Sequence, residues 1–385
     1  AVTLPEAGNI GGGGFMLIQK DGKGDFIDYR ETAPTAAYRD MYLDEQGNVI
    51  ANKSIYGIHA SGVPGSVAGM WLAHQKHGTL KWEELVQPAV TLAEQGFVVP
   101  PKLAKGVSNY IAHLKEQKIN VNFEKYFADV KANKVFKQPE LAATLKRIRD
   151  NGQDGFYKGE TANIIAKFMH QHGGIINQDD LKGYTAKSRT PIKASWNGYE
   201  VLTSPPPSSG GIAILQWLKM YELQKPDAGL AHNSTQYVHL LSEIGKRVFA
   251  DRAEYLGDPD FFDVPVNALT NINYLKERSN GISLTAISTT ENIKPGLKES
   301  EQTTHFSIVD KMGNAVANTT TINLGFGSGV VVEGAGFILN DEMDDFSAKP
   351  GVMNVFGAIG GKANEIQPHK RMLSSMTHTI LLKDN

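Results

Sequence analysis

The chain has 385 residues, a formal net charge of −2 and no cysteine. This composition excludes disulfides, a cysteine nucleophile and thiolate metal sites, and no basic cluster points to nucleic acid as a partner. There is also no apolar run of 18 residues, so the sequence predicts no membrane span. Because no Pro-rich or Ser/Gly-rich linker divides the chain, we expect one interlocked domain.

The first predicted elements are two short strands. A run of four glycines, Gly11 to Gly14, precedes an apolar segment at 15–18. A turn at 21–24 then leads to a second strand at 26–29. No strand precedes the glycines and no helix follows them, so the run is no dinucleotide-binding motif. It indicates instead a close approach of the backbone, or positive φ angles. Arg30 leaves the second strand, and a solvated surface position is the ordinary interpretation of such an arginine.

Helices are expected next, over 67–77 and 82–95 and through most of 101–173. Pro139 suits a helix start and Gly152 a position just past a helix end. A hairpin is predicted around Asn197-Gly198, followed by a Pro-rich loop and a helix over 212–223. Residues 278–302 are rich in Ser, Thr, Asn and Glu, which favours a mobile surface segment.

A second hairpin is predicted to follow that segment. Residues 303–309 alternate, 310–314 form a turn signal, and 315–322 return as the partner strand. Such a hairpin would bring the hydroxyls of Thr303 and Thr321 together. A threonine hydroxyl is a weak nucleophile that requires a base, and an N-terminal threonine can use its own α-amine. This chemistry requires a chain break between Gln302 and Thr303; without one, Thr303 is ordinary β-branched strand sequence.

Three blocks in this order and spacing resemble γ-glutamyltranspeptidases, a family of the N-terminal nucleophile hydrolases. They are Gln302 to Ser307, Asn340 to Ser347, and Lys370 to Met376. Further family-like segments are 30–34, 62–66, 203–211 and 251–259, so that the resemblance covers almost the whole chain.

The resemblance implies an α+β fold, a four-layer αββα sandwich. It also implies a precursor that cuts itself before Thr303. Residues 1–302 would be the large-subunit portion, truncated at its N-terminus, and 303–385 the start of the small subunit, truncated at its C-terminus. The two subunits would stay together as a heterodimer.

The same resemblance assigns candidate site residues. Thr321, 18 residues after Thr303, would hydrogen-bond the nucleophile. Arg30, Ser374 and Ser375 would hold the substrate α-carboxylate, a task that suits the planar fork of an arginine. Another set would hold the α-ammonium group of the glutamyl substrate: Asn323, Glu342 and Asp345. The acidic run 341–345 also has a competing interpretation, as a solvated or calcium-binding loop, although the usual calcium-loop spacing is missing.

Residues 350–361 would form a lid over the pocket, with Phe356 where many family members have a tyrosine. The lost hydroxyl leaves open how the lid is latched. The family's later Gly-Ser-Pro-Gly-Gly loop, which provides the oxyanion hole, is not among the 385 residues.

The expected function is therefore transfer or hydrolysis of γ-glutamyl groups from glutathione and other γ-glutamyl amides. The acceptor would be an amino acid, a dipeptide or water, and no cofactor or metal is implied. The alternatives are a related acylase, acting on cephalosporins or poly-γ-glutamate, and a peptide-binding protein that never cuts itself. The family also implies a periplasmic or secreted protein.

Overall fold

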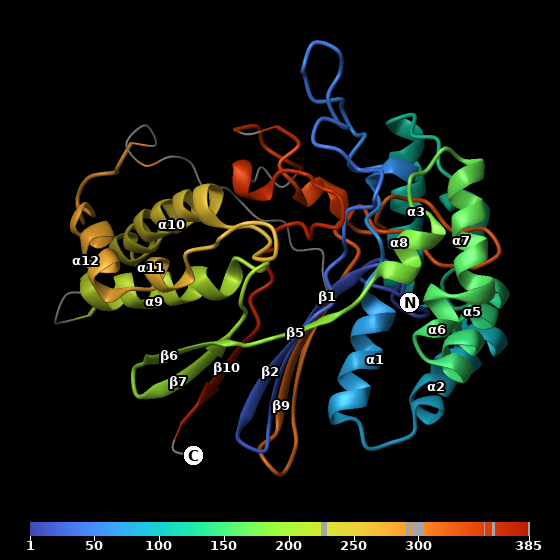
Figure 1. Cartoon of the computed structure of the whole chain (residues 1–385), viewed down its shortest axis with the longest axis horizontal. Coiled ribbons are helices and arrows are strands. Elements are labelled where there is room, and N and C mark those ends of the chain that lie inside the picture. Colours follow the sequence, from blue (N-terminus) through green and yellow to red (C-terminus); the bar gives the residue numbers. More distant parts are fainter. Residues whose placement is uncertain (225–228, 290–292, 294–303, 350, 356–358, 384–385) are drawn as a thin grey trace.

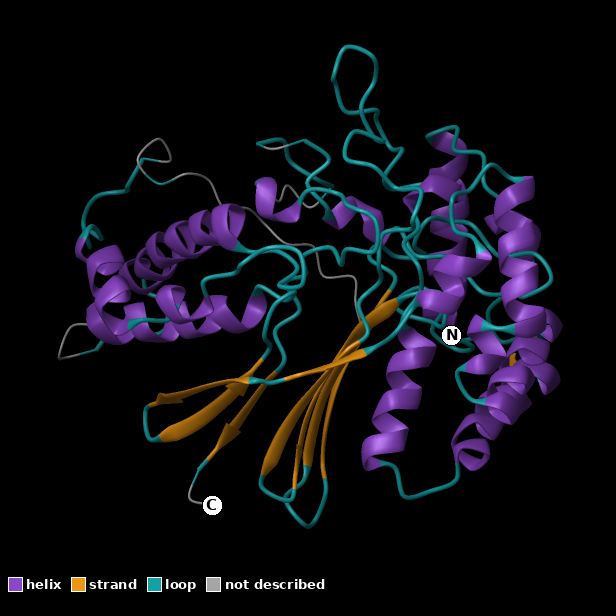
Figure 2. Cartoon of the chain, in the orientation of Figure 1, coloured by secondary structure: helices purple, strands orange, loops and turns teal. Residues whose placement is uncertain are grey.

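The computed structural model describes residues 1–224, 229–289, 293, 304–349, 351–355 and 359–383. Two β-sheets lie in the middle of the molecule, and a group of helices lies on either side (Figures 1 and 2). No helix within these ranges is both long enough and apolar enough to cross a membrane.

The larger sheet has five strands, all antiparallel to their neighbours. Its order is β5 (Lys187–Arg189), β2 (Lys23–Asp28), β1 (Gly13–Lys20), β9 (Ala315–Thr321) and β8 (Thr304–Val309). The predicted strands after the glycine run and the predicted C-terminal hairpin therefore occupy one sheet. Strand β1 joins them, because it pairs with β2 on one side and with β9 on the other.

The smaller sheet consists of β10 (Thr379–Leu382), β7 (Tyr199–Thr203) and β6 (Ile192–Trp196). The hairpin predicted at Asn197-Gly198 is the β6–β7 connection. One apolar cluster joins the facing sides of the two sheets; its buried members are Phe15, Leu17, Phe26, Leu202, Ala317 and Ile380. The alternation of the strands supplies this cluster, since every second side chain points to the same face.

Most helices precede the second sheet in the chain. They are α1 (Ser66–His77), α2 (Trp82–Gln95), α3 (Pro101–Glu116), α4 (Phe123–Phe127), α5 (Pro139–Asn151), α6 (Asp154–Tyr157), α7 (Gly159–Gln171) and α8 (Gln178–Gly183), with a small ribbon of β3 (Phe97–Val98) and β4 (Val135–Phe136). Helix α1 lies against β1 and β2. As predicted, Pro139 occupies the first turn of α5 and Gly152, with φ of 59°, follows its end.

The other outer layer contains α9 (Gly210–Gln224), α10 (Thr235–Tyr255), α11 (Val266–Leu269) and α12 (Ile272–Asn280). Helix α9 contacts β6, so the layers run helix, sheet, sheet, helix and confirm the predicted αββα sandwich. The part of the chain that the structure describes also contains three short 3₁₀ helices: η1 (Ile58–Ala60), η2 (Glu342–Asp345) and η3 (Lys362–Asn364).

The surface segment predicted at 278–302 needs one correction. Helix α12 continues to Asn280, with Leu275 and Ser279 buried, so the segment begins later than predicted. Most of 290–303 lies outside the described residues. The larger and the smaller sheet both contain strands from before and after residue 302. That the chain forms one interlocked domain stays a prediction. The division of the chain at 302 and 303 stays a prediction.

Candidate active site

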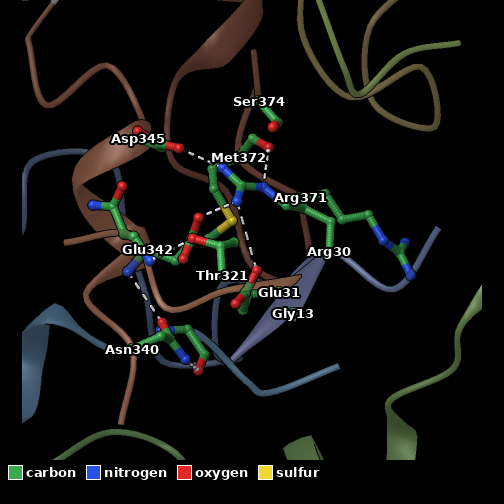
Figure 3. A network of polar contacts seen from close by, with 12 residues as sticks. Gly13, Arg30, Glu31, Thr321, Asn340, Glu342, Asp345, Arg371, Met372 and Ser374 are labelled. Atoms are coloured by element: carbon green, nitrogen blue, oxygen red, sulfur yellow. Dashed lines mark hydrogen bonds and ion pairs between the residues drawn. The ribbon is translucent and has the colours of Figure 1, made fainter. Parts of the chain in front are cut away.

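Arg30 lies two residues after the end of β2, and the structure buries it, with 1% of the side chain exposed. The ordinary interpretation, a solvated arginine at a strand end, is therefore wrong here. Its guanidinium makes ion pairs with Glu342 and Asp345, and it donates from Nε to the carbonyl oxygen of Met372 at 3.2 Å (Figure 3). Burial opposes the charged form, but these carboxylates outweigh it and raise the pKa of Arg30. Arg30 is thus held as a permanent cation in the interior.

The acidic run that supplies these carboxylates is also buried. Asp341, Glu342 and Asp344 are at most 6% exposed, so the interpretation as a solvated loop is wrong. The calcium alternative has no support either, because no group of three or more His, Asp or Glu residues suited to a metal exists among the described residues. The run forms the 3₁₀ helix η2. Its Glu342 and Asp345 carboxylates contact Arg30, and the Asp341 carboxylate accepts from the backbone N–H of Leu324.

Asn340 fixes the start of this run against the glycine segment. Its side-chain nitrogen donates to the carbonyl oxygens of Gly11 at 2.8 Å and Gly62 at 2.9 Å. Its side-chain oxygen accepts from the backbone N–H groups of Gly62 and Glu342. A Cβ atom at Gly11 would lie 2.2 Å from the carbonyl oxygen of Ile338, so no larger residue fits. The close approach predicted for the glycine run is therefore confirmed at this position.

Arg30, Glu31, Glu342 and Asp345 form what we call the Arg30 cluster: one cation against three carboxyl groups. The nearest Glu31 oxygen lies 3.7 Å from Arg30 Nη1, and neither oxygen of Glu31 has a hydrogen-bond partner among the described residues. Burial, reinforced by the charge of Glu342, raises the pKa of Glu31 well above its usual range. Burial also raises the pKa of Glu342 to about 7, against the opposing effect of Arg30. A buried cluster with surplus carboxyl groups is suited to receive a second cation, such as a ligand ammonium.

Thr321 ends β9 beside this cluster (Figure 3). It is buried, and its hydroxyl oxygen accepts the backbone N–H of Asn323 at 2.8 Å. Asn323 has a positive φ of 73°, which turns the chain away from the strand, and its side-chain nitrogen donates to the carbonyl oxygen of Asp341 at 3.0 Å. This bond joins the end of β9 to the acidic run, so that Thr321 and Glu342 are held in one framework.

Ser374 and Ser375 follow the two residues whose carbonyl oxygens accept from Arg30, namely Met372 and Leu373. The segment that begins after β7 clamps them: the backbone N–H and hydroxyl of Ser209 both donate to the carbonyl oxygen of Ser374, at 2.7 and 2.9 Å. The structure therefore brings Arg30, Thr321, Asn323, Glu342, Asp345 and the Ser374–Ser375 pair to one region. Gln302, Thr303 and Phe356 lie outside the described residues.

Sequence reasoning assigned no role to three residues at this site. Glu31 belongs to a family-like block that includes Arg30, but its burial could not be foreseen. Arg252 lies in another such block and reaches Ser375. Asp344 accepts from the Ser54 hydroxyl at 2.6 Å and from the Val355 N–H at 3.0 Å, so it ties the predicted lid segment to a loop near the N-terminus. Only the acidic pattern could have pointed to Asp344.

The αββα arrangement is the fold of the N-terminal nucleophile hydrolases, and comparison with known structures agrees. A γ-glutamyltranspeptidase from Pseudomonas nitroreducens superposes with a TM-score of 0.73 and 51% identity, over 77% of this chain and 88% of that chain. A cephalosporin acylase from Bacillus halodurans gives a TM-score of 0.84 at 25% identity, over 100% of this chain and 68% of that chain.

The family follows from sequence. The pattern that defines the gamma-glutamyltranspeptidase family matches residues 1–385. A glutathione hydrolase proenzyme of Pseudomonas aeruginosa is 54% identical over all of this chain and 68% of its own length. The chain belongs to the γ-glutamyltranspeptidase family.

Proposed function

We propose that this protein transfers and hydrolyses γ-glutamyl groups with Thr303 as its nucleophile, after a cut between Gln302 and Thr303. That it is a γ-glutamyltransferase, or glutathione hydrolase, follows from its family and from its identity to glutathione hydrolases over its whole length. The proposal adds the nucleophile, the cleavage site and the residue roles.

The observation that carries the proposal is the register of β8 and β9. Thr304 pairs with Thr320, and His305 pairs with Thr319. If this antiparallel register continued by one residue, position 303 would lie opposite Thr321, which lies beside the Arg30 cluster. Support for Thr303 as the nucleophile is therefore positional: the first residue of the new chain would start next to a hydroxyl and a charged, buried pocket.

In the proposed first step, the free α-amine of Thr303 takes the proton of its own hydroxyl while the oxygen attacks the γ-carbonyl carbon of the substrate. The bond to the leaving nitrogen breaks, the leaving amine receives that proton, and a γ-glutamyl ester of Thr303 remains. In the second step, water or an acceptor amine attacks the ester carbonyl, and the hydroxyl of Thr303 is restored. Thr321 would hydrogen-bond the Thr303 oxygen throughout.

The substrate head group would be held by opposite charges. Arg30, Ser374 and Ser375 would bind the α-carboxylate. Asn323, Glu342 and Asp345 would bind the α-ammonium, which the surplus of carboxyl groups in the Arg30 cluster favours. Arg30 would then exchange part of its present ion pairing for the ligand carboxylate, while the ligand ammonium would replace Arg30 beside the acids.

The remaining proposals rest on family membership. Residues 1–302 and the part that starts at Thr303 would form a heterodimer from one precursor. Phe356 would belong to a lid, the acceptor would be an amino acid, a dipeptide or water, and the protein would act in the periplasm or outside the cell.

The test uses the purified full-length protein and two threonine variants. The wild type should give two fragments by intact mass, one of them beginning with Thr303, and should release glutamate from glutathione. Thr303→Ala should remain a single chain, because no hydroxyl can attack the preceding carbonyl. Thr304→Ala is the matched control and should still be cut. A Thr303→Ala protein cut before position 303 would overturn the assignment of the nucleophile.

The same experiment separates the alternatives. A single uncut wild-type chain would favour the non-cleaving peptide-binding protein. A cut protein that prefers glutaryl amides, which lack the α-amine, to γ-glutamyl amides would favour the related acylase, a possibility raised by the match to the cephalosporin acylase.

A further inference from the structure

Arg252 reaches Ser375, one of the serines predicted to bind the carboxylate, from the helical layer of α9 to α12. It lies in the last turn of α10 and is half-buried. Its Nη2 donates to the Ser375 hydroxyl oxygen at 2.9 Å, and its Nε donates to the Ser209 hydroxyl oxygen at 3.1 Å. A guanidinium has donors in a rigid fork, so one side chain holds both hydroxyls at fixed positions.

These contacts set the direction of the Ser375 hydroxyl. A serine hydroxyl has one hydrogen to donate and two lone pairs to accept with. Arg252 can only donate, so the Ser375 oxygen is the acceptor in their bond and its hydrogen points elsewhere. The hydrogen of Ser209 is used on the carbonyl oxygen of Ser374 at 2.9 Å, and the Ser209 oxygen lies 3.4 Å from that of Ser375. Ser375 is thereby prepared to donate to an incoming carboxylate.

The charge of Arg252 also acts on this pocket. The pKa of Asp345 is raised by burial, and the charge of Arg252 opposes that rise together with Arg30. Arg30 is already engaged by Glu342 and Asp345. A ligand carboxylate that meets only the Arg30 cluster would therefore face surplus negative charge. Arg252 supplies a second cation close to Ser375, which moves the local balance toward accepting an anion.

We propose that Arg252 is a positioning residue for α-carboxylate recognition: it orients Ser375 as a donor and contributes the second positive charge that the ligand carboxylate requires. This inference rests on the proposed function, since it assumes that Ser375 faces the glutamyl α-carboxylate. It adds a determinant of substrate specificity in α10, outside the segments to which the binding roles were assigned.

The test compares three p-nitroanilides on the mature full-length enzyme. The γ-glutamyl compound carries both head groups, the glutaryl compound lacks the ammonium, and the 4-aminobutanoyl compound lacks the carboxylate. Arg252→Met should lower kcat/KM for the two carboxylate-bearing substrates by about tenfold to a hundredfold, as expected for a lost charge-assisted hydrogen bond. It should change kcat/KM for the 4-aminobutanoyl substrate by less than about twofold. Arg252→Lys should recover part of the loss, because the charge stays and the fork is gone.

Arg278→Met is the matched control, because Arg278 packs on the same helix through Asp251 and the carbonyl oxygen of Arg247. It should lower thermal stability without changing the ratio of kcat/KM values for the γ-glutamyl and 4-aminobutanoyl substrates. In the Ser375→Ala background, Arg252→Met should have a smaller effect on that ratio than in the wild type, since the two residues act as a unit.

In Arg252→Met, an unchanged ratio of kcat/KM for the γ-glutamyl and 4-aminobutanoyl substrates would overturn the proposal. If kcat/KM fell equally for all three substrates, the role of Arg252 would be structural only. Should Arg252→Met fail to mature, Arg252→Lys decides alone: it must lower the ratio of kcat/KM for the γ-glutamyl substrate to that for the 4-aminobutanoyl substrate, because the fork that orients Ser375 is gone, and a wild-type ratio contradicts the inference. Failure of the proposed function is a separate result, in which the wild type itself does not favour the γ-glutamyl substrate.

Discussion

Two clusters of arginine and carboxylate, one buried and one buried except at its Asp260 end, lie close together in this molecule and differ in the ratio of positive to negative charges. The Arg371 network consists of three cations and three carboxylates, namely Lys187, Arg189, Arg371, Asp28, Asp258 and Asp260. The carboxylate oxygens of Asp28 are met by Arg189 Nε at 2.7 Å, by the backbone N–H of Arg30 at 3.0 Å and by Arg371 Nε at 3.3 Å. Lys187 adds a further cation at Asp260. Positive and negative charges in this network therefore match, and its carboxylate oxygens all have partners.

The Arg30 cluster has one arginine and three carboxyl groups, with both Glu31 oxygens and one Glu342 oxygen lacking a hydrogen bond among the described residues. Burying unmatched acids costs free energy unless they take up protons or gain a cation. The balanced network is what a structural role requires. The unbalanced one is what a binding site for an ammonium group would show before its ligand arrives.

Breaking the balanced network should have the largest effect on stability. Arg371→Met removes a cation that is 3% exposed and deprives the buried Asp28 of one of its two ion-pair partners. Loss of one member of a buried ion pair costs about 3–5 kcal/mol. We expect a loss of that size in the free energy of unfolding measured by urea, with KM for γ-glutamyl-p-nitroanilide unchanged in the folded fraction. A rise in KM without loss of stability would mean that the roles of the two clusters are reversed.

Arg30→Lys should affect binding more than stability. Lysine keeps the charge but cannot bind a carboxylate through two parallel donors, so KM for glutathione should rise by about tenfold or more, the effect of about 1.5–3 kcal/mol. Arg189→Lys is the matched control, because Arg189 belongs to the balanced network. It should lower stability and leave KM unchanged. If neither variant changes KM, the head group binds elsewhere.

A smaller effect is expected in the pH dependence of stability. Glu342 has a folded-state pKa raised to about 7 from 4.5, chiefly by burial. Between these values the folded state keeps a proton that the unfolded state has released, so the free energy of unfolding falls as pH rises from about 4.5 to about 7. The Glu342→Gln variant should not show this fall. Between pH 5 and pH 8, its free energy of unfolding should therefore rise relative to that of the wild type by on the order of 2 kcal/mol.

Urea unfolding of both proteins at pH 5, 6, 7 and 8 measures this gain. Glu45→Gln, an exposed position, is the control and should follow the wild type at each pH. If the free energy of unfolding of wild type and of Glu342→Gln changed with pH in the same way, Glu342 would not be held protonated in the interior.

Much of the fold could be predicted from periodicity and turn residues. The β6–β7 hairpin at Asn197-Gly198 and the ends of α5 at Pro139 and Gly152 are local features, and the structure has them as predicted. The pairing of β1 with β9 is not local, since about 300 residues separate them in the chain. No local pattern encodes that contact, and the αββα arrangement came from family resemblance.

The candidate site, like the fold, was predictable only in part. Sequence resemblance selected Arg30, Glu342 and Asp345, and the structure brings them together. Residue type alone gave the wrong environment for Arg30 and left the acidic run open to a solvated or calcium-binding role, because burial depends on what packs over a residue. Glu31 and Arg252 show the same limit: their importance comes from distances to segments far away in the chain, such as 342–345 and 374–375.

The central claim is that Thr303 uses its own α-amine as the base, and the pH dependence of kcat/KM tests it most directly. His305 is the competing base, being two residues away, but both of its ring nitrogens are engaged, with Thr319 at 2.8 Å and Ser307 at 3.3 Å. We predict that kcat/KM of the mature wild type rises through the pKa of an α-amino group, near 8 before any shift by burial or by Glu342 and Asp345. His305→Gln should keep that rise. A rise centred near 6.5 that disappears in His305→Gln, while cleavage before Thr303 stays normal, would contradict the claim.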